Sequence, residues 1–260
     1  MSVKGLAFLK IIKLVWWTAL PLMVLIAWNM ALQSQQNQPC TDLHIKISME
    51  DESYFVEKGA ILKILTADGD ARSLLGKPIK TFNSGYIESE IESNPYVKKA
   101  EVYSTLEGAL NVEVEQRKPL FRVFKQQSKG FYVDEEGMKM PLSPVYSARV
   151  PILRGAVVEN YEGNDTMRTK ALKDAFEILS TISRSDFWSS QIEELHYSLE
   201  GEFTLIPKVG EQRILFGKAE EIEEKLHKLR LFYKHAMPRV GWTTYKVINL
   251  KYSGQIVCEK

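Results

Sequence analysis

The side chains that could support catalysis or bind a metal ion are few in this chain and lie far apart. Four histidines occur, at His44, His196, His227 and His235. The last two are eight residues apart, whereas two metal ligands on one helix need a spacing of about four. The histidine spacing therefore argues against a metal site.

Two acidic runs are the other candidates for chemistry. Residues 134–137 (DEEG) lack the alternating oxygen ligands of a calcium loop and are typical of a hairpin turn. Residues 220–224 carry four glutamates at the start of a predicted helix, where negative charge stabilises the helix dipole. The sequence also lacks GxSxG, Walker and GxGxxG motifs. We therefore expect no catalytic site, no cofactor and no small-molecule substrate.

The net charge and the number of cysteines further restrict the class of protein to which the chain can belong. The chain has 260 residues, with 34 Lys and Arg against 33 Asp and Glu, so its net charge is +1. No basic excess points to a nucleic-acid partner. The two cysteines, Cys40 and Cys258, are too few for a disulfide framework. Whether they are free or form one bridge stays open.

The N-terminal region has the pattern of a membrane anchor. Residues 1–13 carry three lysines and no acidic residue, and residues 14–32 contain no charge. About 20 apolar residues span a bilayer as a helix. The positive-inside rule then predicts a single-pass protein with a cytoplasmic N-terminus and its bulk outside the inner membrane. A cleaved signal peptide is the alternative, but the apolar stretch is longer than such peptides need.

Beyond a polar spacer at 33–41, two folded regions are expected. Residues 42–118 predict a strand, two helices at 55–65 and 84–93, and a hairpin at 94–118, a β-α-α-β-β module. Asn83 or Ser84 is the expected N-cap of the second helix. Residues 119–260 predict a mostly antiparallel sheet with one or two packed helices. The fold class is therefore α+β.

The helices and last strands of the second region are also predicted by their periodicity. Helices are expected at about 169–182, with Asp165 as a possible cap, and at 221–235. The final strand region is expected at 245–252, followed by a short piece at 256–257.

The order of these parts resembles the bacterial cell-division family FtsQ/DivIB, in its Bacteroidetes-like branch. The likeness is carried by residues 94–123, 130–142, 150–155, 203–217, 225–233 and 245–258. Each motif alone is modest, but six in the same order cover essentially the whole chain. The cytoplasmic tail of about thirteen residues is shorter than in many relatives, which puts tail-mediated contacts in doubt.

The resemblance implies a POTRA domain at 42–118 and an FtsQ-type β domain at 119–260. It implies a non-catalytic divisome scaffold at the division septum, in the inner membrane with its bulk in the periplasm. Its partners would be FtsB-like and FtsL-like proteins, with other divisome components possible, bound by β-strand addition in support of septal peptidoglycan synthesis.

The place of partner binding follows from the resemblance rather than from the residues. Taken alone, the strand 245–252 is more simply an interior strand, whereas the resemblance implies an exposed edge that accepts a partner strand. The implied partner-binding residues are Asn249, Leu250, Lys251, Tyr252, Ser253 and Gly254, with Lys225 and Arg230 on the neighbouring helix.

Two other functions compete with this interpretation. One is a POTRA-containing protein of secretion or outer-membrane assembly, which should carry further POTRA repeats or a barrel that 260 residues cannot hold. The other is an anchored envelope hydrolase, which needs a nucleophile or a metal in a cleft.

Overall fold

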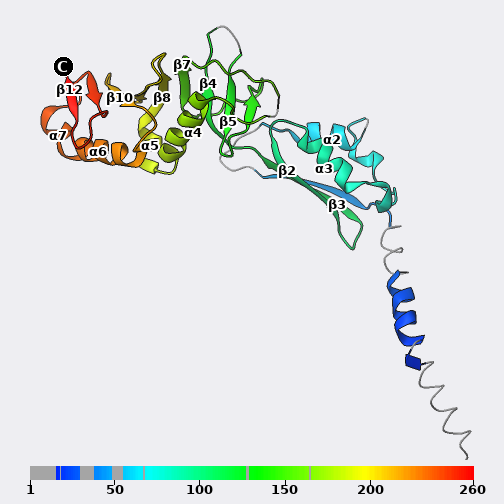
Figure 1. The fold of residues 1–260 in the computed structure, drawn as a ribbon. Helices are drawn as coiled ribbons and strands as arrows, with labels where there is room; N and C mark the ends of the chain where they lie inside the picture. The colour runs from blue at the N-terminus through cyan, green and yellow to red at the C-terminus, as the bar shows by residue number, and fades with distance from the viewer. Residues whose placement is uncertain are drawn as a thin grey trace, which may run out of the picture. The chain divides into compact units, whose positions relative to one another are not determined.

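The computed structural model contains two compact units (Figure 1). The structure describes residues 16–17, 19–29, 38–48, 55–66, 68–126, 129–163 and 165–260. Residues 38–48 and 56–115 belong to the first unit. Phe55 and residues 116–260 belong to the second.

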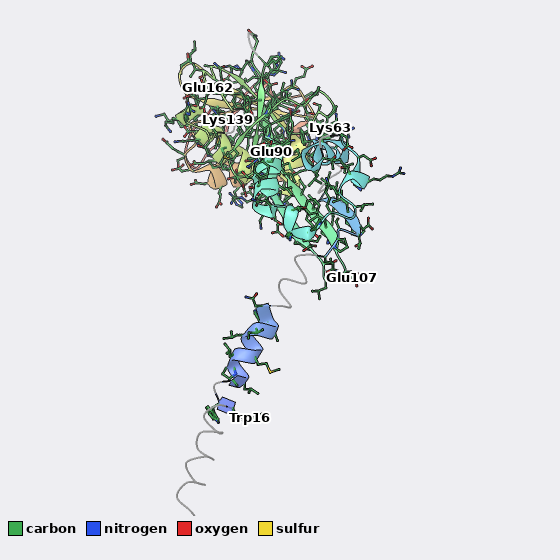
Figure 2. The ribbon with its side chains drawn as sticks, turned by 90° about the vertical axis from the view of Figure 1, so that its right-hand side faces the viewer. Trp16, Lys63, Glu90, Glu107, Lys139 and Glu162 are labelled. Carbon is green, nitrogen blue, oxygen red and sulfur yellow. The ribbon has the colours of Figure 1, made fainter. Side chains whose placement is uncertain are left out.

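Only part of the predicted membrane anchor lies within the described residues. Residues 16–17 and 19–29 are helical. The side chains of Trp16, labelled in Figure 2, and of Trp28 are exposed. Within the described ranges, no helix combines the length and the apolar character needed to cross a membrane. The predicted tail 1–13, both ends of the predicted span and most of the spacer 33–41 lie outside the described residues.

The first unit has the predicted β-α-α-β-β order. Its main elements are β1 (Asp42–Ser48), α2 (Lys58–Leu65), α3 (Ser84–Glu92), β2 (Val97–Ser104) and β3 (Ala109–Gln116), with two short 3₁₀ turns at Ala71–Ser73 and Ile79–Thr81. The sheet order is β1-β3-β2, and β1 runs parallel to β3. Helix α2 starts at Lys58, three residues later than the predicted 55.

Local sequence explains this unit well. Leu110, Val112 and Val114 alternate along β3 and are all at most 1% exposed. Asn83 is the N-cap of α3, because its side chain accepts a hydrogen bond from the Tyr86 backbone N–H. Gly108 closes the hairpin at a φ of +89°, and a Cβ there would lie 2.6 Å from the Pro39 carbonyl oxygen, so the turn requires glycine.

The second unit is built on a nine-stranded sheet. The strand order is β12-β11-β10-β9-β8-β7-β4-β5-β6. The strands are β4 (Pro119–Val123), β5 (Phe131–Asp134), β6 (Lys139–Pro141), β7 (Ile152–Gly155), β8 (Ile192–Tyr197), β9 (Phe203–Pro207), β10 (Arg213–Gly217), β11 (Val247–Asn249) and β12 (Val257–Glu259). Five neighbouring pairs are antiparallel and three are parallel, so the prediction of a mostly antiparallel sheet is confirmed.

Helices cover one face of this sheet. They are α4 (Lys170–Ser183), α5 (Asp186–Gln191), α6 (Ile222–His235) and α7 (Met237–Val240), and Figure 1 shows α4, α5 and α6 along one side of the strands. Leu172 of α4 and Leu229 of α6 are fully buried in one core with strand residues such as Phe203, Phe216 and Ile248. The short helices α5 and α7 were not predicted.

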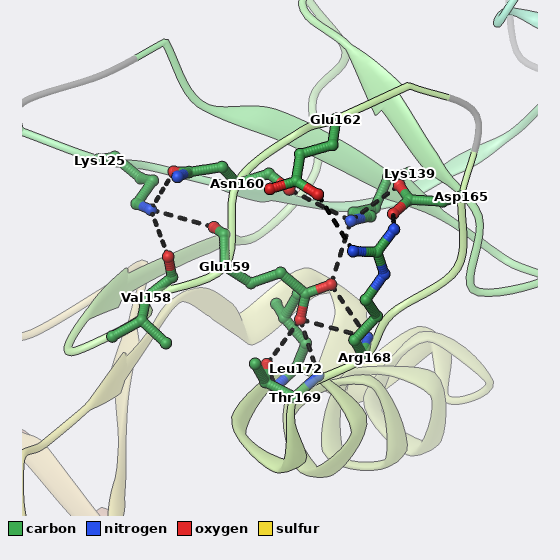
Figure 3. A network of polar contacts seen from close by, with 10 residues as sticks. All are labelled: Lys125, Lys139, Val158, Glu159, Asn160, Glu162, Asp165, Arg168, Thr169 and Leu172. Atoms are coloured by element: carbon green, nitrogen blue, oxygen red, sulfur yellow. Dashed lines mark hydrogen bonds and ion pairs between the residues drawn. The ribbon is translucent and has the colours of Figure 1, made fainter.

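The start of α4 corrects one prediction. Thr169, not Asp165, is the N-cap, because its side chain accepts from the Leu172 backbone N–H. Asp165 instead lies 2.8 Å from the Lys139 ammonium in a buried polar network (Figure 3). Lys139 is 1% exposed, and a buried ammonium requires such compensating carboxylates.

Glu159 is the centre of this network. Its carboxylate lies 3.1 Å from the Lys139 ammonium and accepts hydrogen bonds from the backbone N–H groups of Arg168 and Thr169 and from the Thr169 hydroxyl (Figure 3). Burial alone would raise the pKa of Glu159, but these hydrogen bonds outweigh it and hold the pKa at about 2. The carboxylate thus fastens the 159–169 segment to β6.

Candidate partner-binding edge

The two ends of the nine-stranded sheet differ in how their backbone groups are used. At the β6 end, the Lys139 N–H donates to the Asp165 carbonyl at 2.9 Å, and Met138 forms a bridge with Thr166. Pro141 in the same strand has no N–H to offer. The segment around Asp165 therefore covers this end of the sheet.

Strand β12 forms the opposite end. It pairs antiparallel with β11, with Val247 opposite Glu259 and Asn249 opposite Val257. Among the described residues, no strand pairs with its other side. Val257 is 39% exposed there.

The register shows which backbone groups of β12 point outward. Arg213 donates to the Lys246 carbonyl and Leu250 donates to the Leu215 carbonyl, so the even-numbered residues of β11 face β10. Val247 and Asn249 therefore face β12, and their partners Glu259 and Val257 face back. The N–H and C=O of Cys258 are consequently directed away from the sheet.

This arrangement corrects the predicted edge. The prediction that 245–252 is an exposed edge strand is wrong, because only Val247–Asn249 is a strand and it is bonded on both sides. The cause is the α6–α7 connection, which returns the chain parallel to β10, as parallel strands require a long crossover. The chain then turns back through 250–256 and adds β12 outside β11.

The predicted site residues are divided between the core and the surface of this region. Asn249 is 8% exposed, and its side chain accepts from the Lys251 backbone N–H at 3.0 Å. Leu250 is fully buried in the core. Lys251 pairs with Glu202 at 3.1 Å across to the neighbouring hairpin.

The turn that follows is the exposed part of the predicted site. Tyr252 is 49% exposed, and Ser253 and Gly254 are exposed beside it. Gly254 has a φ of +72°, a left-handed conformation that glycine adopts without strain.

Lys228 of α6 holds this turn and was missed by the sequence analysis. Its ammonium donates to the Tyr252 carbonyl at 2.6 Å and to the Leu250 carbonyl at 3.4 Å. Its role could have been suspected from its position three residues after Lys225, because residues three apart are neighbours on one face of a helix.

The two predicted residues of α6 have different environments. Lys225 is 7% exposed, and its ammonium donates to the Lys218 carbonyl at 2.9 Å and lies 4.9 Å from the centre of the Phe216 ring. Burial lowers the pKa of Lys225. Arg230 is exposed, with its guanidinium 5.2 Å from the centre of the Phe187 ring.

Neither the cysteines nor the acidic residues form a reactive cluster in the part of the chain that the structure describes. Cys40 and Cys258 are both free thiols, and burial raises the pKa of each. Within the described ranges, no group of three or more His, Cys, Asp or Glu side chains could hold a metal ion.

The second unit has a pocket of about 690 Å³ whose lining includes Lys125 and Arg154. Both of these cations already have hydrogen-bond or ion-pair partners within the unit. The Lys125 ammonium donates to the Val158 and Glu159 carbonyls and to the Asn160 side chain. Arg154 pairs with Glu194 at 2.8 Å.

Comparison with known families agrees with this two-unit organisation. Residues 38–115 match the model of a POTRA-like domain. Residues 118–259 match the model described as FtsQ/DivIB, C-terminal related. The fold thus defines a protein with a POTRA-like domain followed by a mostly β domain with a few helices. Since the second match covers more than half of the 260 residues, the chain belongs to the FtsQ/DivIB family.

Two curated relatives carry the name cell division protein FtsQ. The chain is 26% identical to the one from Geotalea daltonii over 176 residues, which is 67% of this chain and 62% of the relative. It is 26% identical to the one from Rhodothermus marinus over 190 residues, 70% of this chain and 67% of the relative. The match therefore spans about two thirds of the length of these relatives.

Proposed function

We propose that this protein is a non-catalytic scaffold of the divisome that binds FtsB-like and FtsL-like proteins by strand addition at β12. In this role it links division proteins at the septum and supports septal peptidoglycan synthesis. The observation that carries the proposal is the outward-facing backbone of Cys258 at the open end of the sheet. Unpaired backbone groups at a sheet edge can pair with a strand of another chain.

The residues around β12 supply the side-chain contacts in this proposal. Lys251, Tyr252, Ser253 and Gly254 form the turn beside the edge strand. Arg230 is exposed on α6 with its guanidinium over the Phe187 ring of α5, so of the predicted α6 residues it is not one that touches this turn. Three of the predicted residues have buried side chains and would support the edge without touching the partner: Asn249, Leu250 and Lys225.

A proline at Cys258 tests strand addition at this edge. The C258P variant removes the outward N–H without removing a hydrogen bond to β11, since Cys258 faces away from that strand. We expect capture of the purified FtsB-like and FtsL-like partners to weaken at least about tenfold, as expected from losing a central strand-pairing bond and placing the proline ring against the partner.

The matched control is C258A, which removes the same thiol but keeps the backbone N–H. It should capture both partners as the wild type does, and the melting temperatures of the two variants should be similar. If C258P also captured both partners normally, binding by strand addition at β12 would be wrong.

An anchored hydrolase is the remaining enzymatic alternative. Incubating the purified full-length protein with peptidoglycan and measuring released fragments distinguishes the two functions. The scaffold proposal expects no release above a heat-inactivated sample, and release by the native protein would contradict it.

A further inference from the structure

Strand β2 is an edge strand of the POTRA-like unit, and its outward backbone groups are identifiable. The Thr105 N–H donates to the Ala109 carbonyl, so the odd-numbered residues of this segment face β3. Since backbone direction alternates along a strand, the N–H groups of Ala100 and Val102 point away from the sheet. These are the groups that a partner strand would pair with.

Both outward N–H groups are already occupied by carboxylates of α3. Glu88 accepts from the Val102 N–H at 2.7 Å, and Glu92 accepts from the Ala100 N–H at 3.0 Å. Hydrogen bonds to a charged acceptor are stronger than those between neutral groups. Two residues of one helix thus replace two acceptors of a missing strand.

The match between helix and strand has a geometric basis. Glu88 and Glu92 are four residues apart, a rise of about 6.0 Å along a helix at 1.5 Å per residue. Ala100 and Val102 are two residues apart, about 6.6–6.8 Å along a strand. The pairing runs in opposite directions, with the first glutamate on the later strand residue, as in an antiparallel ladder.

We propose that Glu88 and Glu92 are edge-blocking residues that prevent β2 from pairing with β2 of a second copy of this chain. With the β2 edge blocked, β1 is the other edge strand of this sheet among the described residues, and it is the edge at which the POTRA-like unit could accept a partner strand. It concerns a different unit from the β12 edge and does not depend on the proposed scaffold function.

The sequence of β2 indicates why a second copy is the partner to be excluded. A two-fold pairing centred on Ala100 would place Lys99 of each copy opposite Glu101 of the other. Both side chains are exposed and opposite in charge, and such cross-strand pairs stabilise a sheet. An unblocked β2 would therefore be complementary to itself.

The test uses the full-length chain in detergent and the double variant E88A/E92A. Two measurements are made, the sedimentation behaviour over a range of concentrations and the amide exchange of Ala100 and Val102. In dilute samples the double variant should exchange these two amides at least about tenfold faster than the wild type, as expected for losing charge-assisted hydrogen bonds. At high concentration it should associate beyond the wild type and regain protection at both amides.

Two controls separate edge blocking from charge and from stability. E88Q/E92Q removes the same two charges but keeps an acceptor oxygen on each side chain, so it should sediment as the wild type and exchange the two amides more slowly than E88A/E92A does. E90A removes a carboxylate from the exposed Glu90 of α3, labelled in Figure 2, and should change neither measurement.

Either of two results would overturn the proposal. If E88A/E92A lost amide protection but sedimented as the wild type at every concentration, the two glutamates would only satisfy buried amides. Association of E88Q/E92Q to the same extent as E88A/E92A would equally contradict it, because charge rather than occupancy of the edge would then be the cause.

Discussion

The Glu159 carboxylate shows how a single residue can tie stability to pH in this protein. Its pKa is held at about 2 in the folded chain, against 4.5 for an unperturbed glutamate. Such a difference corresponds to at most about 3.5 kcal/mol, because each pKa unit is worth about 1.4 kcal/mol. Since the folded pKa is the lower one, this stability is present above the unfolded pKa and is lost as pH falls toward 2.

We therefore predict that the free energy of unfolding of the second unit falls between about pH 5 and pH 2, and that E159Q reduces this dependence. At pH 7, E159Q should cost about 2–4 kcal/mol, because it leaves the buried Lys139 with less compensation. Urea unfolding at pH 7 and pH 3.5 measures both effects. E162Q is the control, since Glu162 is exposed; an equal change in E162Q would contradict the prediction.

Helix α6 contributes to the core and also holds the 250–252 turn next to β12, through the hydrogen bonds that Lys228 donates to the turn. We predict that K228M loosens this turn with little loss of global stability, about 1 kcal/mol or less, since Lys228 is only partly buried. Amide exchange in the 250–256 segment should accelerate several-fold, and partner capture should weaken in parallel.

K234M provides the comparison for this prediction, because Lys234 is an exposed lysine of the same helix. It should leave both exchange and capture unchanged. Unchanged exchange in K228M would show that the two carbonyl contacts do not order the turn.

The elements differ in how well sequence predicts them, and the difference is physical. The β3 strand and helices α3, α4 and α6 were predicted because their apolar period is set locally over eight or more residues. Strands β11 and β12 have three residues each, too few for a period, and their order in the sheet depends on contacts across the chain. The exposed edge was therefore assigned to 245–252 instead of 257–259.

The N-cap of α4 and the edge-blocking glutamates of α3 also could not be predicted from the sequence, because both depend on contacts made only in the folded chain. Thr169 and Asp165 are both good N-cap residues, and only the position of the buried Lys139 ammonium determines that Asp165 is used elsewhere. The glutamates at 88 and 92 are ordinary helix residues in the sequence. Their acceptor role depends on β2, which lies beside α3 only after folding.

For the whole molecule, we propose that residues 14–32 anchor the chain in the inner membrane with residues 42–118 and 119–260 outside it. The double variant L20R/V24R should shift the protein from the membrane to the soluble fraction, because each arginine at a helix centre costs about 2.5–3.5 kcal/mol on insertion. Fractionation followed by immunoblotting measures the shift. Retention of the variant in carbonate-washed membranes would contradict a spanning segment.

The covered β6 end of the nine-stranded sheet has a consequence for assembly. A filament built by strand pairing needs two free ends on every subunit, so that each copy can bind one neighbour in front and one behind. With one end occupied by the segment around Asp165, two copies pairing through this sheet would form a closed pair and growth would stop there. The same sheet could therefore offer a strand site to a partner without adding further copies of this chain one after another.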